Sequence, residues 1–162
     1  MNAPLVLSPA ALADIDRAVA KYPAEQKQSA VMAALTVAQG EKGWLSTATM
    51  DFVAHYLDMP PIAVYEVASF YTMYDLKPVG KCKLAICTNL PCALQGATVA
   101  AAHLKQKLGI GFGETTADGA FTLKEAECLG ACGDAPVLLV NDKRMACAMT
   151  PDQLDKLLEE MK

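Results

Sequence analysis

The hydrophobic pattern of the sequence changes at residues 77–80 (Lys-Pro-Val-Gly), and this change divides the chain into two parts. Before it, apolar residues recur at the i, i+3, i+4 and i+7 spacing of amphipathic helices. After it, short apolar runs alternate as they do in strands. We therefore expect a helical N-terminal domain over residues 1–78 and a second domain of mixed helix and strand over residues 79–162.

Four helices are expected in the first part, each with an apolar stripe on its buried face. Ser8 is expected to cap the first helix, with Pro9 at its first position. The second is expected over residues 24–41, with Gly40 and Gly43 at its exit. The four stripes comprise Leu12, Ile15, Val19 and Tyr22; Val31, Leu35 and Ala38; Met50, Val53, Ala54 and Leu57; and Val64, Val67, Ala68 and Tyr71.

The second part is expected to follow the order strand, helix, three strands, helix (βαβββα). Its strands are expected at 83–86, 121–127, 137–140 and 145–149, with helices at 93–108 and 151–161. Asn141-Asp142 has the composition of a hairpin turn between the last two strands. The order predicts an α/β, thioredoxin-like arrangement, a small mixed sheet with helices on both faces.

Two cysteine pairs directly follow expected strands. Cys87 and Cys92 form a C-x4-C pair, and Cys128 and Cys132 form a C-x3-C pair. In a thioredoxin-like sheet both loops can lie at the same end, which allows four thiolates to converge on one bound group. Soft thiolate ligands select zinc, copper(I), or iron and sulfide.

The loops favour an iron-sulfur centre over zinc, although cysteine spacing alone leaves structural zinc open. A thiolate-bound [2Fe-2S] centre is negatively charged and needs N–H donors around it. We expect Gly130 and Gly133 to adopt positive φ and approach sulfur closely. We expect Thr88, Asn89 and the start of the following helix to add donors.

The remaining cysteines and the histidines are expected to be structural. Cys82 and Cys147 belong to expected strands and pair with no cysteine at ligand spacing, so core positions are expected for both. His55 and His103 lie in helical segments away from the cysteine pairs, which favours surface or packing roles. The sequence has no C-x-x-C motif, which argues against thiol-disulfide exchange activity.

Charge and composition exclude several classes of protein. The chain has 14 Lys and Arg against 18 Asp and Glu, a net charge of −4, and no basic run. It therefore lacks the electrostatic pattern of a nucleic-acid-binding protein. We expect neither a signal peptide nor direct membrane insertion, and so a reducing cytoplasm. There, six cysteines favour metal or redox roles over disulfides.

Residues 86–92 (ICTNLPC) and 121–136 (FTLKEAECLGACGDAP) closely resemble the thioredoxin-like [2Fe-2S] subunit of bacterial NADH:quinone oxidoreductase, respiratory complex I. Residues 66–74 (EVASFYTMY) and 76–81 (LKPVGK) look like the segment that joins the two domains of that subunit. Related subunits of NAD-reducing hydrogenases and NAD-dependent formate dehydrogenases share the four cysteines.

The resemblance implies that Cys87, Cys92, Cys128 and Cys132 ligate one [2Fe-2S] cluster. It also implies a flavoprotein partner that binds FMN and NADH, together with other subunits of the cytoplasmic peripheral arm of an inner-membrane complex. In that family the cluster exchanges an electron with FMN, and no independent catalytic turnover is expected. The alternatives are the equivalent subunit of a hydrogenase or formate dehydrogenase, a zinc-stabilised interaction module, or a free-standing ferredoxin.

Overall fold

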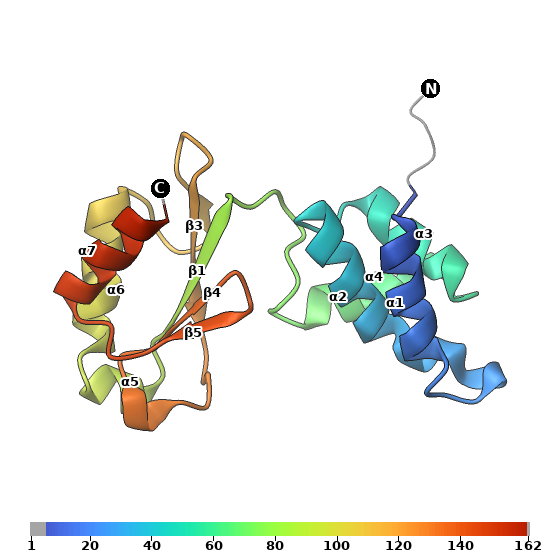
Figure 1. Cartoon of the computed structure of the whole chain (residues 1–162), viewed down its shortest axis with the longest axis horizontal. Coiled ribbons are helices and arrows are strands. Elements are labelled where there is room, and N and C mark those ends of the chain that lie inside the picture. The colour runs from blue at the N-terminus through green and yellow to red at the C-terminus, as the bar shows by residue number, and fades with distance from the viewer. Residues whose placement is uncertain (1–5, 162) are drawn as a thin grey trace. The chain divides into compact units, whose positions relative to one another are not determined.

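The computed structural model describes residues 6–161. The chain divides into two compact units, residues 1–78 and residues 79–162. The first is helical and the second is built on a sheet (Figure 1). Among residues 6–161, no helix combines the length and apolar composition that a bilayer span requires.

The described part of the helical unit, residues 6–78, has four α-helices and one 3-10 segment. These are α1 (Pro9–Val19), η1 (Ala24–Ala30), α2 (Val31–Lys42), α3 (Thr47–Tyr56) and α4 (Pro61–Phe70). Each α-helix contributes at least one fully buried side chain to one core, among them Ile15, Leu35, Val53 and Val64. The apolar stripes that predicted the four helices are therefore what holds them together.

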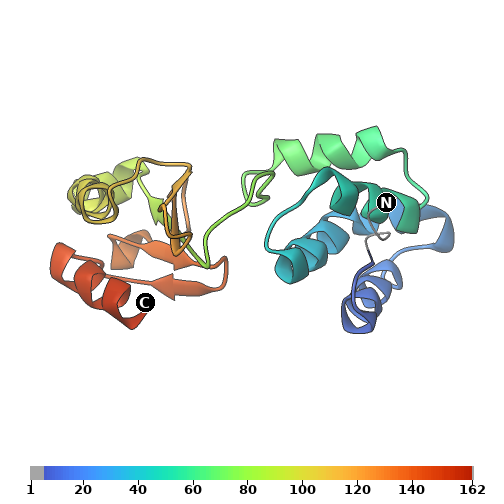
Figure 2. The ribbon, with the colours of Figure 1, turned by 90° about the horizontal axis from the view of Figure 1, so that it is seen from above.

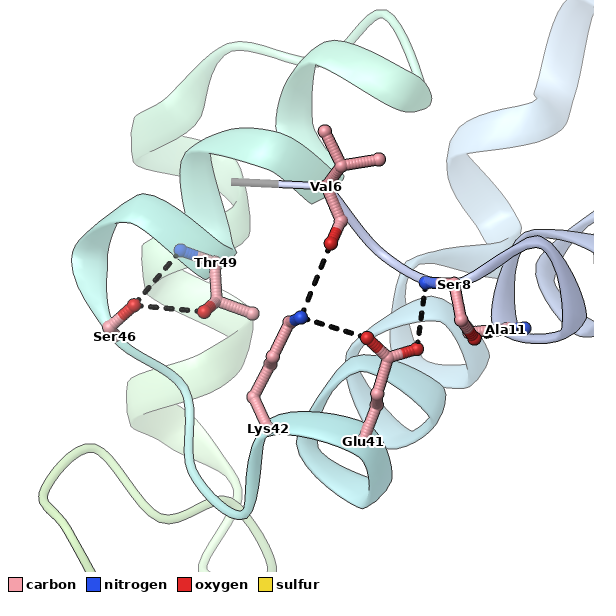
Figure 3. Close-up of polar contacts among 7 residues, drawn as sticks. All are labelled: Val6, Ser8, Ala11, Glu41, Lys42, Ser46 and Thr49. Carbon is pink, nitrogen blue, oxygen red and sulfur yellow. Dashed lines mark hydrogen bonds and ion pairs between the residues drawn. The ribbon is translucent and has the colours of Figure 1, made fainter. Parts of the chain in front are cut away.

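The chain before α1 is fastened to the end of α2 by a polar network (Figure 3). Ser8 caps α1, its Oγ accepting from the N–H of Ala11 at 3.2 Å. Its own N–H donates to Glu41 Oε2 at 2.9 Å, and Lys42 Nζ donates to the Val6 carbonyl at 3.2 Å. The hydrogen bond from Lys42, with those from Ser8, lowers the pKa of Glu41 to about 2. The Glu41 carboxylate is therefore charged at neutral pH, where it accepts these hydrogen bonds.

The prediction of a helix over residues 24–41 is wrong for its first part, residues 24–30. Residues 24–30 form the 3-10 segment, within which Gln26 has φ −122° and ψ 26°, and the α-helix begins only at Val31. The physical reason is burial, because Ala30 is the one buried residue of that segment. The helix then runs through Gly40 and ends at Gly43, whose φ is +81°.

Two tyrosines of the expected stripes are not in the core. Tyr22 lies beyond the end of α1 and is 42% exposed. Tyr71 lies just beyond α4 and is 39% exposed. Both helices end one to three residues earlier than periodicity predicts, so these side chains leave the helical face.

The sheet unit consists of β1 (Cys82–Cys87), α5 (Leu90–Leu94), α6 (Ala97–Leu108), β2 (Glu114–Thr115), β3 (Phe121–Ala126), η2 (Cys132–Asp134), β4 (Leu138–Val140), β5 (Arg144–Ala146) and α7 (Pro151–Glu160). The strand order is β2-β3-β1-β4-β5. Strands β1 and β3 are parallel, and the other neighbours are antiparallel. The central strand is thus β1, the strand that leads into the first cysteine pair.

Both long helices of this unit pack on the same face of the sheet. Alternate residues of β1, Cys82, Leu84 and Ile86, form one core with side chains of α6 and α7. Figure 2 shows the two helices on one side of the strands. The expectation of helices on both faces is therefore wrong. The reason is that α6 and α7 bury their apolar faces on the same set of strand residues.

The sheet unit differs from the predicted order in two further places. The helix expected over 93–108 is divided into α5 and α6 by Gly96, whose φ of +93° is incompatible with a continuous helix. A two-residue edge strand, β2, pairs with β3 and was not expected. The expected hairpin turn is present, with Asn141 and Asp142 at φ +50° and +59°.

Candidate metal centre

The two cysteine-bearing loops leave the sheet at the same end, where strands β1 and β3 both finish (Figure 1). Strands β1 and β3 are parallel, and their last residues, Cys87 and Ala126, are register partners. The N–H of Thr88 extends the ladder by donating to the Ala126 carbonyl at 3.2 Å. Cys128 follows two residues later, so both pairs begin beside each other at the carboxyl ends of the strands.

The first pair is built into the fold. Cys87 and Cys92 are both fully buried, and they pack with Ala97 and Val137 in a small cluster of their own. The N–H of Cys87 donates to the Val137 carbonyl at 3.1 Å, which fixes its backbone against the chain that follows the second pair. Cys92 lies on α5. The sheet and the short helix α5 therefore position both thiols of this pair.

The thiol of Cys92 also connects the two pairs. Burial raises its pKa to about 11, and hydrogen bonds and electrostatic interactions with Cys87 and Cys132 act in the same direction. The thiols of Cys87, from the first pair, and Cys132, from the second, thus both lie within interaction distance of Cys92. Forming a second thiolate beside the first is unfavourable unless a cation compensates the charge, which is what a bound metal centre does.

Cys128 differs from the other three because it is exposed on its loop. Its Sγ accepts a hydrogen bond from the N–H of Gly130 at 3.4 Å, and Gly130 has φ +74°, as expected. Among residues 6–161, no three His, Cys, Asp or Glu side chains are already arranged as a metal-binding group. The structure places Cys87 and Cys132 within interaction distance of Cys92, with Cys128 on the adjoining loop, but does not arrange them as a finished metal site.

The donor set suits a thiolate-ligated group. All six cysteines are free, so the four candidates remain available as ligands. Gly130 already directs an N–H at a cysteine sulfur, the kind of contact that stabilises thiolate-bound iron. A Cβ added at Gly130 or Gly133 would meet no atom within 4 Å, so the loop is open at both glycines. These residues fit a [2Fe-2S] centre.

Three expectations about the loops are wrong. Gly133 lies within η2 and does not have positive φ. The side chains of Thr88 and Asn89 do not donate to sulfur, because Thr88 Oγ1 donates to Glu125 Oε1 at 2.7 Å and Asn89 Nδ2 donates to Glu127 Oε2 at 3.2 Å. Sequence reasoning missed these two glutamates, and the available signal was a pair of carboxylates beside Cys128.

The two other cysteines are unlike each other. Cys82 is a core residue, as expected, and its thiol donates to Met161 Sδ at 3.5 Å. Burial raises its pKa to about 11. Cys147 is exposed, which corrects the expected core position. The reason is that β5 ends at Ala146, so Cys147 has already left the sheet.

Both histidines lie outside the cysteine site. His103 Nε2 contacts Asp155 Oδ1 at 2.7 Å and links α6 to α7. His55 is exposed in the last turn of α3. The surface and packing roles expected for them agree with these positions.

Comparison with known proteins gives closely related sequences. The chain is 43% identical over 145 residues to an NADH-quinone oxidoreductase subunit of Rickettsia bellii, covering 89% of this chain and 86% of that protein. It is 42% identical over 150 residues to the mitochondrial NADH dehydrogenase [ubiquinone] flavoprotein 2 of Dictyostelium discoideum, covering 90% of this chain and 61% of that protein.

A solved structure and a family model agree on the fold. The crystal structure of an NAD+-reducing [NiFe]-hydrogenase in the H2-reduced state aligns with a TM-score of 0.69 at 21% identity, covering 78% of this chain and 22% of that one. Residues 15–162 match the model of the thioredoxin-like [2Fe-2S] ferredoxins. By that match and by the sequence relatives, the chain belongs to the thioredoxin-like [2Fe-2S] ferredoxin family.

Proposed function

We propose that this chain is an electron-transfer subunit of an NADH:quinone oxidoreductase, complex I, in which Cys87, Cys92, Cys128 and Cys132 ligate one [2Fe-2S] cluster. When bound, the cluster takes up and returns a single electron. The observation that carries the proposal is the meeting of the two cysteine loops at the carboxyl ends of the parallel strands β1 and β3, with Cys92 beside Cys87 and Cys132.

The residues of the chain hold this centre in three ways. Burial of Cys87 and Cys92 removes water from one side of the site. The N–H of Gly130 supplies a hydrogen bond to sulfur. Cys128 lies on an exposed loop whose glycine conformation lets the backbone turn back toward the site. The chain itself makes and breaks no substrate bond, so it has no turnover of its own.

The partner we propose is a flavoprotein subunit that binds FMN and NADH, and reduced FMN is the electron donor. The support is the sequence relationship, since relatives of 43% identity are named as subunits of NADH-quinone oxidoreductase. In this proposal residues 1–78 and 79–162 are separate domains, and the cluster belongs to the second. The assembly lies in the cytoplasmic, peripheral arm of a membrane complex.

Serine substitution tests the ligand set. Each of Cys87, Cys92, Cys128 and Cys132 is replaced in turn, with exposed Cys147→Ser as the matched control. We expect each of the four variants to lose iron and sulfide or to change the spectrum of the reduced protein, whereas the control keeps both. An unchanged iron content and spectrum in any of the four variants would remove that cysteine from the ligand set.

The host complex is tested by tagging the chain in its own cells and identifying the proteins that co-purify from gently solubilised membranes. We expect an FMN-containing subunit together with quinone-reducing subunits. Recovery of a hydrogenase or formate dehydrogenase instead would assign the chain to that complex. Recovery of the chain alone would favour a free-standing ferredoxin.

A further inference from the structure

Two side-chain bridges connect the cysteine loops, in addition to the backbone ladder. Thr88 Oγ1 donates to Glu125 Oε1 at 2.7 Å, and Asn89 Nδ2 donates to Glu127 Oε2 at 3.2 Å. Thr88 and Asn89 directly follow Cys87, and Glu127 directly precedes Cys128. Each bridge therefore ties the chain next to one cysteine pair to the chain leading into the other.

Asn89 is used in an unusual way. It occupies the N-cap position of α5, where asparagine commonly accepts a hydrogen bond from the first turn of the helix. Its side chain makes no such capping bond here. The amide is directed to Glu127 instead, which indicates that joining the loops takes precedence over capping a five-residue helix.

The acceptors in both bridges are carboxylates, so the bridges also add negative charge beside the cysteine site. Glu125 shares its register position with Ile86, whereas the neighbouring Lys124 pairs with Ala85 and belongs to the opposite face of the sheet, the one that Cys87 shares. Glu127 directly precedes Cys128, so its charge is the nearer of the two carboxylates to a cysteine in the sequence. A negative charge near a redox centre disfavours the extra electron of the reduced state.

We propose that Glu125 and Glu127 are positioning residues that join the two cysteine loops through Thr88 and Asn89 and lower the reduction potential of the centre. This inference rests on the proposed function, because it assumes the [2Fe-2S] cluster. Glutamine at either position keeps an oxygen acceptor for the bridge but removes the charge, whereas alanine removes both. The two roles can therefore be measured separately.

The charge role is tested on the cluster-containing protein by redox titration followed by EPR. We expect Glu127→Gln and Glu125→Gln each to shift the midpoint potential to more positive values, and the double variant to shift it further. The shifts shrink at high ionic strength, since Glu127 is exposed and its charge is screened. If both variants keep the wild-type midpoint at low salt, the charge role is wrong.

Glu159→Gln is the control, because it removes the same charge at the far end of the sheet. Glu159 is exposed near the end of α7, two residues before Met161, which contacts Cys82 at the start of β1. Cys82 and Cys87 are five residue steps apart along the strand, roughly 17 Å. That is well beyond the Debye length of about 8 Å at physiological salt. A midpoint shift in this control as large as in Glu127→Gln would contradict a local effect.

The positioning role is tested by the rate at which a chelator removes iron. We expect Glu127→Ala to lose its cluster several-fold faster than Glu127→Gln, and Asn89→Ala to resemble Glu127→Ala although it keeps the carboxylate. Equal rates in all three variants and wild type would overturn the positioning role. A wild-type protein without iron and sulfide would instead refute the proposed function, so the two failures are distinguishable.

Discussion

Two cysteines at opposite ends of β1 show what separates a structural thiol from a candidate ligand. Cys82 and Cys87 are both buried and both belong to the central strand. Cys82 packs among apolar side chains and donates to Met161 Sδ at 3.5 Å. Cys87 lies beside Cys92 in a separate small cluster. Burial therefore does not distinguish them, and position along the strand does.

The difference follows from strand geometry. Successive side chains of a strand point to opposite faces, so Cys82 packs with Leu84 in the core under α6 and α7, whereas Cys87 packs with Cys92 and Val137 in the separate cluster at the end of the strand. Cys87 is also the last residue of the strand, where the chain leaves the ladder beside the end of β3. Ligand chemistry is expected at such strand ends because loops from neighbouring parallel strands meet there.

The largest expected effect comes from replacing these two cysteines by alanine. Cys87→Ala should abolish the cluster, because a ligand is lost. Cys82→Ala should retain iron and sulfide and cost about 1 kcal/mol of folding stability through the lost core contact. Iron content and denaturant unfolding measure the two effects. Loss of iron in Cys82→Ala would contradict the structural role of Cys82, and full iron in Cys87→Ala would contradict the ligand role of Cys87.

Alkylation of the cluster-free protein should distinguish buried Cys82 from the exposed cysteines by its rate. Burial raises the pKa of Cys82 to about 11, so its thiolate is scarce near neutral pH. Exposed Cys128 and Cys147 should react first with iodoacetamide, and Cys82 among the last. The Cys82 rate should rise about tenfold per pH unit up to its pKa. Mass spectrometry that finds Cys82 modified as fast as Cys147 in folded protein would contradict this.

The smallest expected effect comes from two glycines of nearly equal conformation. Gly130 has φ +74° in the cysteine loop, and Gly119 has φ +70° near the Cys82 end of the sheet. Neither would bring an added Cβ within 4 Å of another atom, so alanine costs about 1 kcal/mol of backbone strain at either position. Only Gly130→Ala should also speed iron loss to a chelator. The same acceleration in Gly119→Ala would show that it reflects general destabilisation.

Much of the fold could be predicted from the sequence because periodicity reports burial directly. The stripe of Val53, Ala54 and Leu57 and the capping role of Ser8 were correctly identified because each depends on neighbours within one turn of helix. The break at Gly96 and the edge strand β2 were missed. A single left-handed residue and a two-residue strand produce no periodic signal.

At the cysteine site, too, the sequence pattern predicted only those features that depend on neighbouring residues. Spacing predicted the two pairs, because each follows its own strand. The bridges from Thr88 and Asn89 to Glu125 and Glu127 could not be predicted, since they depend on the parallel register of β1 and β3. The exposure of Cys147 was missed for a similar reason, because strand β5 ends one residue before it.

The metal and sulfide content of the purified protein distinguishes a [2Fe-2S] centre from a zinc site. The protein is purified without oxygen, assayed for iron, zinc and acid-labile sulfide, and examined by EPR after reduction with dithionite. If the four cysteines ligate one [2Fe-2S] cluster, we expect about two irons and two sulfides per chain, with the signal of a single reduced [2Fe-2S] centre. Stoichiometric zinc without sulfide and without a signal would contradict this ligand assignment, and would make the two cysteine pairs a structural zinc site.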